Sequence, residues 1–212
     1  MKISVLQPNF FPFKSYFDVV RDVDKVVFAD DSFYNKKSWV DKTIIKRNNV
    51  KFVFKIPSVS HSQSEPLNEI TIVSKNWKRN FLKMIGTEYQ NEINFDKVFP
   101  TIKEVVNLPT DSVSTISAYS VYRISELLGF GTKFTLSSVE HKGLKGSFKN
   151  KIIKICKKEK SCQFHTFAMY KDTFNSHFFI KNNVNISYYS SFHEDKYSVI
   201  DGLMKDADLF KK

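Results

Sequence analysis

The sequence predicts an α/β protein built on a Rossmann-like, mostly parallel sheet, with a helical middle and C-terminal portion. Two observations lead to this fold class. Short apolar runs alternate with amphipathic helical segments at both ends of the 212-residue chain, as in proteins whose helices cover a parallel sheet. The opening residues read as strand, loop, helix and strand within about thirty positions, the length of a βαβ unit. We expect one domain over residues 1–212, in which about 76–128 could form a helical subdomain.

The opening unit begins with an apolar run at 2–6, which predicts a buried strand. Pro12 suits the first turn of the helix that follows. Four side chains then recur at the spacing of one helix face, namely Phe13, Tyr16, Phe17 and Val20. A second apolar run at 25–29 predicts the next strand, which ends in two acids.

Further apolar runs predict strands at 52–56, 69–73, 133–136, 162–164 and 186–189. Helical spacing predicts helices at 76–89, 95–106, 112–128, 147–159, 173–181 and 197–205. Gly129 stands where a glycine commonly ends a helix. The stretch 32–47 reads as a loop rich in lysine.

The composition indicates a globular protein. The chain is 42% hydrophobic and 15% aromatic, which supports a packed core and excludes a disordered chain. No apolar run is long enough to cross a bilayer, and no cleavable signal pattern opens the chain. We therefore expect a cytoplasmic protein without membrane insertion. Cys156 and Cys162 fit neither a zinc site nor a CxxC pair, so we expect reduced, structural cysteines.

The net charge of +11 raises the question of nucleic-acid binding. The excess is mostly lysine, whereas arginine, the residue suited to forked phosphate recognition, is scarce. We do not expect a nucleic-acid partner. Phosphorylated small molecules suit this charge equally well.

Polar side chains follow most of the predicted strands. Ligands of open α/β sheets bind beyond the carboxyl ends of the strands, so we expect at least three of these groups to line one pocket. The groups are Gln7 and Asn9, Asp30 and Asp31, His61, Ser137 and Ser138, and His165. Tyr16, on the first helix, joins the predicted substrate-binding residues.

The stretch QPNFFPFKSYF holds two prolines and four phenylalanines in eleven residues. We expect Gln7, Pro8 and Asn9 to shape the ligand pocket. Phe11, Phe13 and Phe17 are expected to pack the first helix onto the sheet. Two of Phe10, Phe11 and Phe13 should be core residues.

The basic stretch after Asp31 interleaves cations with aromatic rings. Lys36, Lys37 and Lys42 accompany Trp39. A nucleotide fits this chemistry, with its base on an aromatic face and its phosphates against ammonium groups. A solvated basic loop is the equally weighted alternative.

Candidate catalytic residues are His61, Asp30 and Asp31. His61 lies in a polar stretch and titrates in the range useful for acid–base chemistry, although a surface histidine without a role would look the same; His165 ranks second. The two acids could bind a sugar hydroxyl, hold a metal, or cap the next segment. One pair offers too few ligands for a metal, so we predict none. Neither a dinucleotide fingerprint nor a P-loop occurs.

These residues carry a resemblance to the WbqC-like family of bacterial surface-polysaccharide clusters. The matching stretches are MKISVLQPNFFPFKSYFDVV, DVDKVVFADD, YNKKSWVDKTII, FKIPSVSHSQ, LLGFGTKFTLSS and YSVIDGLMKDA. Two departures stand out. The chain has Lys149 and Lys151 where the family often has arginine, and it reads FHTFAMY where the family often has a Gly-Gly turn.

The resemblance implies a cytoplasmic enzyme of O-antigen or capsule biosynthesis that modifies a nucleotide-linked sugar. Acyl or aminoacyl transfer to an amino sugar is the reaction we expect, with His61, Asp30 or Asp31 as base and Gln7 or Ser137 as oxyanion donor. The cofactor is unknown, an activated acyl donor being one candidate, and a homodimer is one option for assembly. Alternatives are a glycosyltransferase and a non-catalytic nucleic-acid binder.

Overall fold

The computed structural model describes residues 1–34, 38–59, 65–189 and 197–206. Contacts between residues divide the chain into two compact units, each made of three chain segments. Unit 1 comprises Met1–Gln7, Ser15–Ser32 and the described residues from Gly131 to Tyr189. Unit 2 comprises Pro8–Lys14, the described residues between Phe33 and Phe130, and 197–206.

Unit 1 is built on a five-stranded sheet with the order β5-β2-β1-β6-β7. All four strand pairs are parallel. The strands are β1 (Lys2–Leu6), β2 (Lys25–Phe28), β5 (Lys133–Leu136), β6 (Gln163–Phe167) and β7 (Asn185–Tyr189). The helices are α1 (Lys14–Arg21), α5 (Ser137–Glu140), α6 (Phe148–Lys158) and α7 (Ser176–Lys181), with a short 3₁₀ turn at Ala168–Tyr170. The predicted α/β class with a parallel, Rossmann-like sheet is confirmed.

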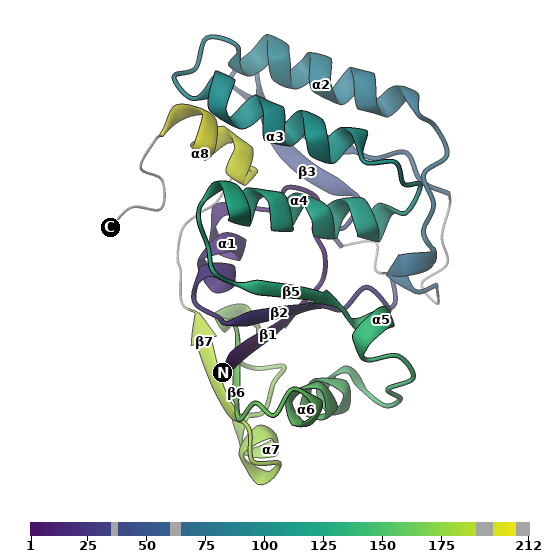
Figure 1. Ribbon diagram of the computed structural model, residues 1–212, viewed down its shortest axis with the longest axis vertical. Coiled ribbons are helices and arrows are strands. Elements are labelled where there is room, and N and C mark those ends of the chain that lie inside the picture. The colour runs from purple at the N-terminus through teal and green to yellow at the C-terminus, as the bar shows by residue number, and fades with distance from the viewer. Residues whose placement is uncertain (35–37, 60–64, 190–196, 207–212) are drawn as a thin grey trace. The chain divides into compact units, whose positions relative to one another are not determined.

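The core of unit 1 lies between the sheet and two helices. Alternate strand residues such as Ile3, Val27 and Phe164 pack against the apolar faces of α6 and α7, because side chains one residue apart in a strand point to opposite faces. Phe164 stacks on Phe179 of α7 with ring centroids 5.6 Å apart. Figure 1 shows α6 and α7 on one side of the sheet and α1 on the other.

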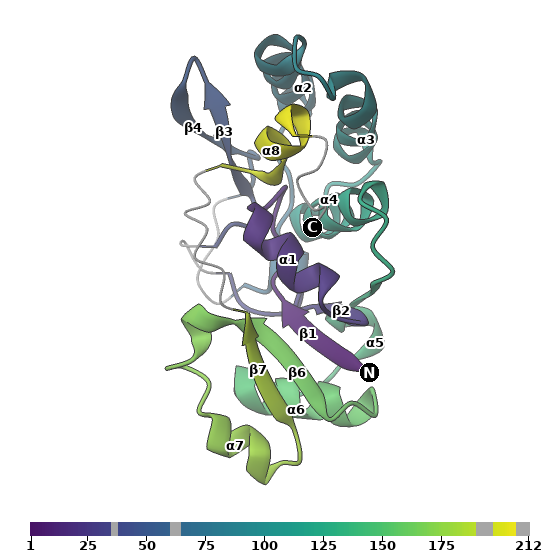
Figure 2. The same cartoon turned by 90° about the vertical axis from the view of Figure 1, so that its left-hand side faces the viewer.

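Unit 2 combines a hairpin with a helical layer. Strands β3 (Lys42–Arg47) and β4 (Val50–Lys55) pair antiparallel. The helices are α2 (Asn76–Tyr89), α3 (Phe95–Asn107), α4 (Val113–Leu127) and α8 (Val199–Lys205), with a 3₁₀ turn at Leu67–Glu69. Figure 2 shows the hairpin beside α8 and α2.

The segment Pro8–Phe13 belongs to unit 2 and is held by side chains from three directions. The Phe11 N–H donates to Ser120 Oγ at 3.0 Å. The Phe11 carbonyl accepts from Thr43 Oγ1 at 2.9 Å and from Ser198 Oγ at 2.7 Å. These bonds hold Phe11 at a φ of 41°, a conformation that a bulky residue rarely adopts.

The aromatic packing of this segment corrects one expectation. Phe10 and Phe11 are fully buried, so two of the three predicted core phenylalanines are confirmed. Phe11 stacks on Phe81 of α2 at 6.0 Å, and Phe13 lies edge-on to Trp39 at 5.3 Å. Both rings therefore pack within unit 2, and Phe17, which is buried in α1, is the ring that packs in unit 1.

Three predicted elements differ from the structure. The predicted strand at 69–73 is wrong, because this stretch forms the end of a 3₁₀ turn and two isolated bridges. The last six residues of the predicted loop at 32–47 form β3, where Thr43 and Ile45 are buried and their neighbours are more exposed. The predicted strand at 162–164 extends to Phe167, so His165 lies inside a strand and does not follow one.

The helices at 76–89, 95–106, 112–128 and 147–159 are confirmed to within a residue or so at each end. None of the helices in the described ranges is long and apolar enough to cross a bilayer. Cys156 is buried and Cys162 is exposed, and both are free thiols. Burial raises the pKa of the Cys156 thiol to about 12, which keeps it protonated and unreactive.

Candidate functional site

The carboxyl ends of β1, β2 and β5 are neighbours in the sheet of unit 1. They bring together five of the predicted site residues, because the chain leaves each of these strands at the same edge. Gln7 follows β1, Asp30 and Asp31 follow β2, and Ser137 and Ser138 follow β5. We call these five residues the edge cluster.

Asp30 joins the ends of β2 and β5. Its side chain is buried, with 2% of the residue exposed. Oδ1 accepts a hydrogen bond from the Ser138 N–H at 2.9 Å, and Oδ2 accepts one from the Ser138 hydroxyl. Asp30 therefore satisfies the first turn of α5, and both of its oxygens already have a donor.

Asp31 is paired with a buried lysine. Lys151 Nζ contacts Asp31 Oδ1, with 9% of the lysine side chain and 22% of the aspartate side chain exposed. Lys151 lies on the buried face of α6 with Ile152 and Ile155, where an ammonium group requires an anion. The pair places one positive and one negative charge beside each other in the edge cluster.

The remaining members of the edge cluster are Gln7 and Ser137. Gln7 Nε2 donates to Ser32 Oγ at 3.4 Å, and the Tyr16 hydroxyl donates to the Gln7 carbonyl at 2.7 Å. Burial raises the pKa of Tyr16 well above its usual value, so this hydroxyl remains a donor. Ser137 Oγ is buried and has no hydrogen-bond partner among the described residues.

His165 lies in the middle of β6, beside Ser187 of β7 in the strand register. Its Nδ1 is 2.8 Å from Ser187 Oγ, while Nε2 is buried without a hydrogen-bond partner in the described ranges. Burial lowers the pKa of the imidazole, so the ring is neutral at physiological pH. Ser187 had no signal in the sequence, because only the strand pairing brings it to His165.

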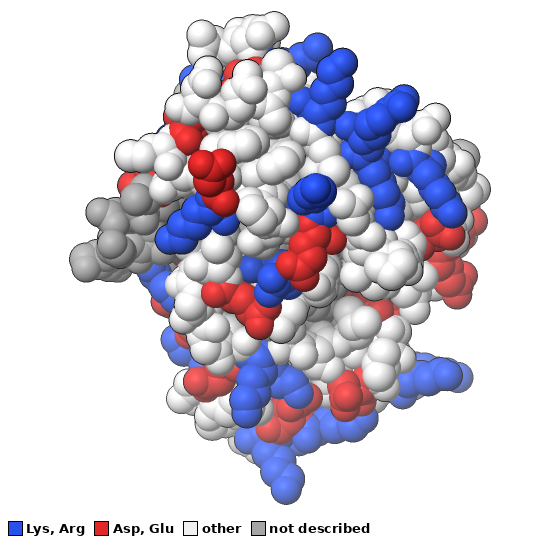
Figure 3. Space-filling model, turned by 45° about the horizontal axis from the view of Figure 1, so that its top comes forward, with Lys and Arg blue, Asp and Glu red and all other residues white. Residues whose placement is uncertain are grey.

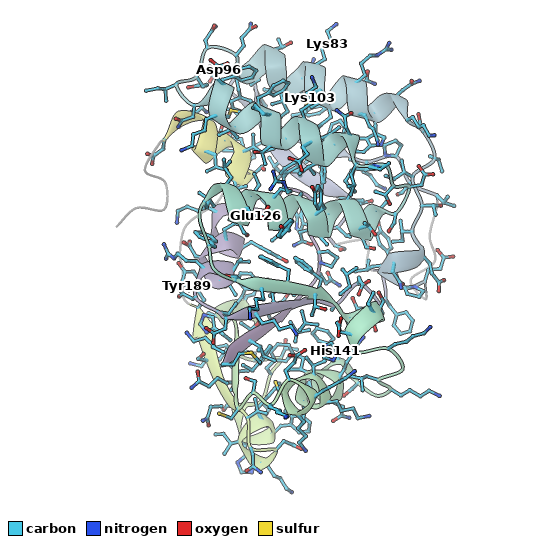
Figure 4. All side chains as sticks on the ribbon, viewed as in Figure 1. Lys83, Asp96, Lys103, Glu126, His141 and Tyr189 are labelled. Atoms are coloured by element: carbon cyan, nitrogen blue, oxygen red, sulfur yellow. The ribbon has the colours of Figure 1, made fainter. Side chains whose placement is uncertain are left out.

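A second buried histidine follows α5. Figure 4 labels His141 at this position, and 1% of the residue is exposed. Its Nε2 lies 3.0 Å from Glu159 Oε1, which Lys25 Nζ also approaches at 2.6 Å. Burial lowers the pKa of His141 more than Glu159 raises it.

Three of the remaining predicted site residues belong to unit 2, and three lie outside the described residues. Asn9, Trp39 and Lys42 belong to unit 2, with Lys42 at the start of β3. Lys36, Lys37 and His61 lie outside the described residues. The structure also shows a fully buried carboxylate in unit 2 that sequence reasoning missed, Asp41.

On the face drawn in Figure 3, the described Lys and Arg side chains lie interspersed with Asp and Glu. Within the described ranges, no three His, Cys, Asp or Glu residues come together as they would to hold a metal ion.

Comparisons of the sequence with known proteins identify its family. The profile of the WbqC-like protein family matches residues 7–203. The chain is 21% identical over 138 residues to the uncharacterized protein Rv1507c of Mycobacterium tuberculosis, a match that covers 64% of this chain and 60% of that protein. No solved structure matches.

Proposed function

The chain belongs to the WbqC-like protein family, and from that premise we propose that it is a sugar-modifying transferase of O-antigen or capsule biosynthesis. The substrate is a nucleotide-linked amino sugar. The reaction is transfer of an acyl or aminoacyl group from an activated donor to the sugar's amino group.

The observation that carries this proposal is the edge cluster. It combines a carboxylate that is paired with a buried ammonium, Asp31 with Lys151, and a buried hydroxyl without a partner among the described residues, that of Ser137. It lies where α/β sheets commonly bind ligands. Acyl transfer to an amine requires a proton acceptor and a donor for the developing oxyanion.

In the proposed reaction the amine nitrogen attacks the acyl carbon, and a C–N bond forms. The bond from that carbon to the leaving group of the donor then breaks, and the leaving group takes the electron pair. Asp31 receives the proton that nitrogen loses, while the Ser137 hydroxyl donates to the oxyanion of the intermediate. Asp30, with both oxygens engaged by Ser138, holds α5 in place.

A thermal-shift screen of the purified chain tests the proposal. The panel contains UDP-, dTDP- and GDP-linked amino sugars, free nucleotides, acyl-CoA donors and a short RNA. A ligand at 100 times its dissociation constant stabilises the protein by about 2.7 kcal/mol. Stabilisation by an amino-sugar nucleotide, followed by acylated product with a matching donor, is the expected result.

Other results would remove the proposal. Stabilisation by RNA alone would indicate a nucleic-acid binder. Nucleotide-sugar binding that requires Mg²⁺ or Mn²⁺ and ends in release of free nucleotide would indicate glycosyl transfer. No response to any sugar nucleotide would leave the edge cluster without its proposed ligand.

A further inference from the structure

Asp41 is a buried carboxylate in unit 2, immediately before β3. The residue is 0% exposed, and the backbone around it is fixed. The Asp41 carbonyl accepts from the Ile56 N–H at 2.8 Å, and the carbonyl of Val40 accepts from Ser117 Oγ at 2.5 Å. These two bonds hold the backbone at the base of the Asp41 side chain.

Two neighbours approach the Asp41 side chain. Lys55 Nζ lies 3.4 Å from Oδ2. Tyr34 is the other neighbour: burial, the charge of Asp41 and a side-chain hydrogen bond with it raise the pKa of the phenol. These two donors leave part of the capacity of the carboxylate open, because an ionised carboxylate offers about four acceptor positions.

The ion pair between Lys55 and Asp41 is long, and its lysine is largely exposed. The lysine side chain is 54% exposed, although Asp41 is fully buried. Other lysine–carboxylate pairs in this chain are much shorter, at 2.6 Å for Lys25 with Glu159 and for Lys205 with Asp201. A charge-assisted N–H···O bond has a length of about 2.7–2.9 Å. The ammonium of Lys55 therefore lies near the Asp41 carboxylate but is too far from it for a bond of that kind.

A second buried acceptor lies on the adjoining segment. Asn9 Oδ1 is buried and has no hydrogen-bond partner in the part of the chain that the structure describes. The N–H of Phe10, the next residue, donates to the Trp39 carbonyl at 3.2 Å, which places the Asn9 backbone beside the turn that leads to Asp41. Buried polar atoms without partners are few in folded proteins, and each calls for an explanation.

We propose that Asp41 is the anchor of a binding site for the primary ammonium group of a small molecule. An ionised carboxylate and an amide oxygen only accept hydrogen bonds, so the ligand must be a donor. A cation also offsets the cost of the buried charge. The ammonium group of Lys55 already occupies the approach to Oδ2, which shows that a group of this shape and charge fits there.

The lysine also provides the entry route. Its side chain is 54% exposed, so in this proposal an incoming ammonium takes the position of the Lys55 ammonium when that side chain moves out into solvent. This inference concerns residues of unit 2 and does not depend on the transfer reaction proposed for the edge cluster. Either idea can fail while the other stands.

The test uses the full chain and two variants, Asp41→Asn and Lys55→Ala. The probes are propylamine and glucosamine, with tetramethylammonium and glucose as controls at equal ionic strength. Thermal shift and NMR titration measure binding. Propylamine and glucosamine should bind wild type and the controls should not, because tetramethylammonium has no N–H and glucose has no charge.

The variants should change the response in opposite directions. Asp41→Asn should reduce the affinity for both amines about tenfold or more, the equivalent of one charged hydrogen bond. Lys55→Ala should increase it, because the probe no longer competes with the chain's own ammonium. Asp41→Asn should keep or raise the melting temperature of the free protein, since it removes a buried charge and leaves only a hydrated lysine behind.

Three results would overturn the proposal. The first is amine binding that is unchanged in Asp41→Asn, which would put the amine elsewhere. The second is binding in Lys55→Ala but not in wild type, which would make Lys55 the permanent partner of Asp41. The third is no amine binding in any variant, together with a lower melting temperature of Asp41→Asn, which would make the carboxylate a structural residue.

Discussion

Asp30 and Asp31 are adjacent in the chain, yet their side chains have different partners. Asp30 is held by the backbone and hydroxyl of Ser138, whereas Asp31 faces the ammonium of Lys151. The two donors of Ser138 are neutral and do not balance the charge of Asp30, whereas the ammonium of Lys151 balances that of Asp31. We therefore expect Asp30 to act on stability and Asp31 to act on the proposed reaction.

Replacing one member of the Asp31–Lys151 pair should cost more than replacing both. Asp31→Asn leaves the buried ammonium of Lys151 unpaired, and loss of one partner from a buried pair costs about 3–5 kcal/mol. The double variant Asp31→Asn with Lys151→Met should recover much of that loss, as measured by urea unfolding. The transferase activity should stay absent in both, which separates catalysis from stability. A double variant with restored activity would contradict the role of Asp31.

Acid should destabilise the protein through His141. Burial holds the pKa of this histidine below its ordinary value of 6.5, so the unfolded chain binds the proton more readily than the folded chain. The stability contributed by neutral His141 is complete above pH 6.5 and is lost as the pH falls. Urea unfolding at pH 7.5 and 5.5 should show this loss.

His141→Gln is the matched variant for that measurement. It should show a smaller difference in unfolding free energy between the two pH values than wild type does. Part of the difference should remain, because the pKa of His165 is also lowered by burial. An equal pH dependence in wild type and His141→Gln would show that the titration of His141 does not contribute.

The site was predictable where it depends on strand ends and not where it depends on tertiary packing. Asp30, Asp31, Ser137 and Ser138 follow strands whose apolar runs are plain in the sequence. Lys151 was noted only as a departure from the family pattern and not as a site residue, although it shares the helical spacing of Ile152 and Ile155 on α6. Asp41 had no signal, because its burial is produced by segments far apart in the chain. Whether His61 acts as a base stays a prediction.

At the scale of elements, α4 acts as a support for loops. Its buried serines bond to segments that carry no regular structure of their own. Ser117 Oγ donates to the Val40 carbonyl at 2.5 Å, and Ser120 Oγ accepts from the Phe11 N–H at 3.0 Å. Serine is a modest helix former, so these positions are explained by the bonds they make outside the helix.

Ser120→Ala should therefore destabilise the protein more than a matched change on the same helix. It leaves the buried N–H of Phe11 without its acceptor, at a cost of about 1–3 kcal/mol. Ser125→Ala is the control, because Ser125 Oγ donates to the Val121 carbonyl one turn earlier on the same helix, and loss of that bond leaves no N–H group without an acceptor. Urea unfolding compares the two. Equal losses would mean that the bond to Phe11 does not stabilise the loop.

Element prediction succeeded where one periodicity dominated. The α2 stripe of Trp77, Phe81 and Ile85 gave the bounds of that helix as the structure has them. β3 was missed because Lys42, Lys46 and Arg47 made the stretch look like a basic loop, although Thr43 and Ile45 are buried at alternate positions. The stretch 69–73 has the composition of a strand, but only isolated bridges form there.

At the scale of the molecule, the chain passes back and forth between the two units. Each consists of three segments, so neither can be excised as a continuous piece. Loss of one unit would release the ends of the segments that form the other. We therefore predict a single cooperative transition, in keeping with the one domain expected from the sequence.

Phe164→Ala tests this cooperativity. It opens a cavity in the core of unit 1, at a cost of about 3–5 kcal/mol. Both tryptophans of the chain, Trp39 and Trp77, belong to unit 2, so their fluorescence reports that unit, whereas far-ultraviolet circular dichroism reports both. The two signals should shift together in denaturant. A fluorescence transition that keeps its wild-type midpoint would show that the units unfold separately.

The central position of β1 has a consequence for synthesis of the chain. β1 lies between β2 and β6, and the Phe11 carbonyl that follows it accepts from Ser198, 187 residues further on. The ribosome therefore releases an aromatic, proline-containing segment long before its last neighbours have been made. Chaperones that shield apolar nascent chains should meet this segment first, and premature stop codons near the C-terminus should yield chains that are degraded.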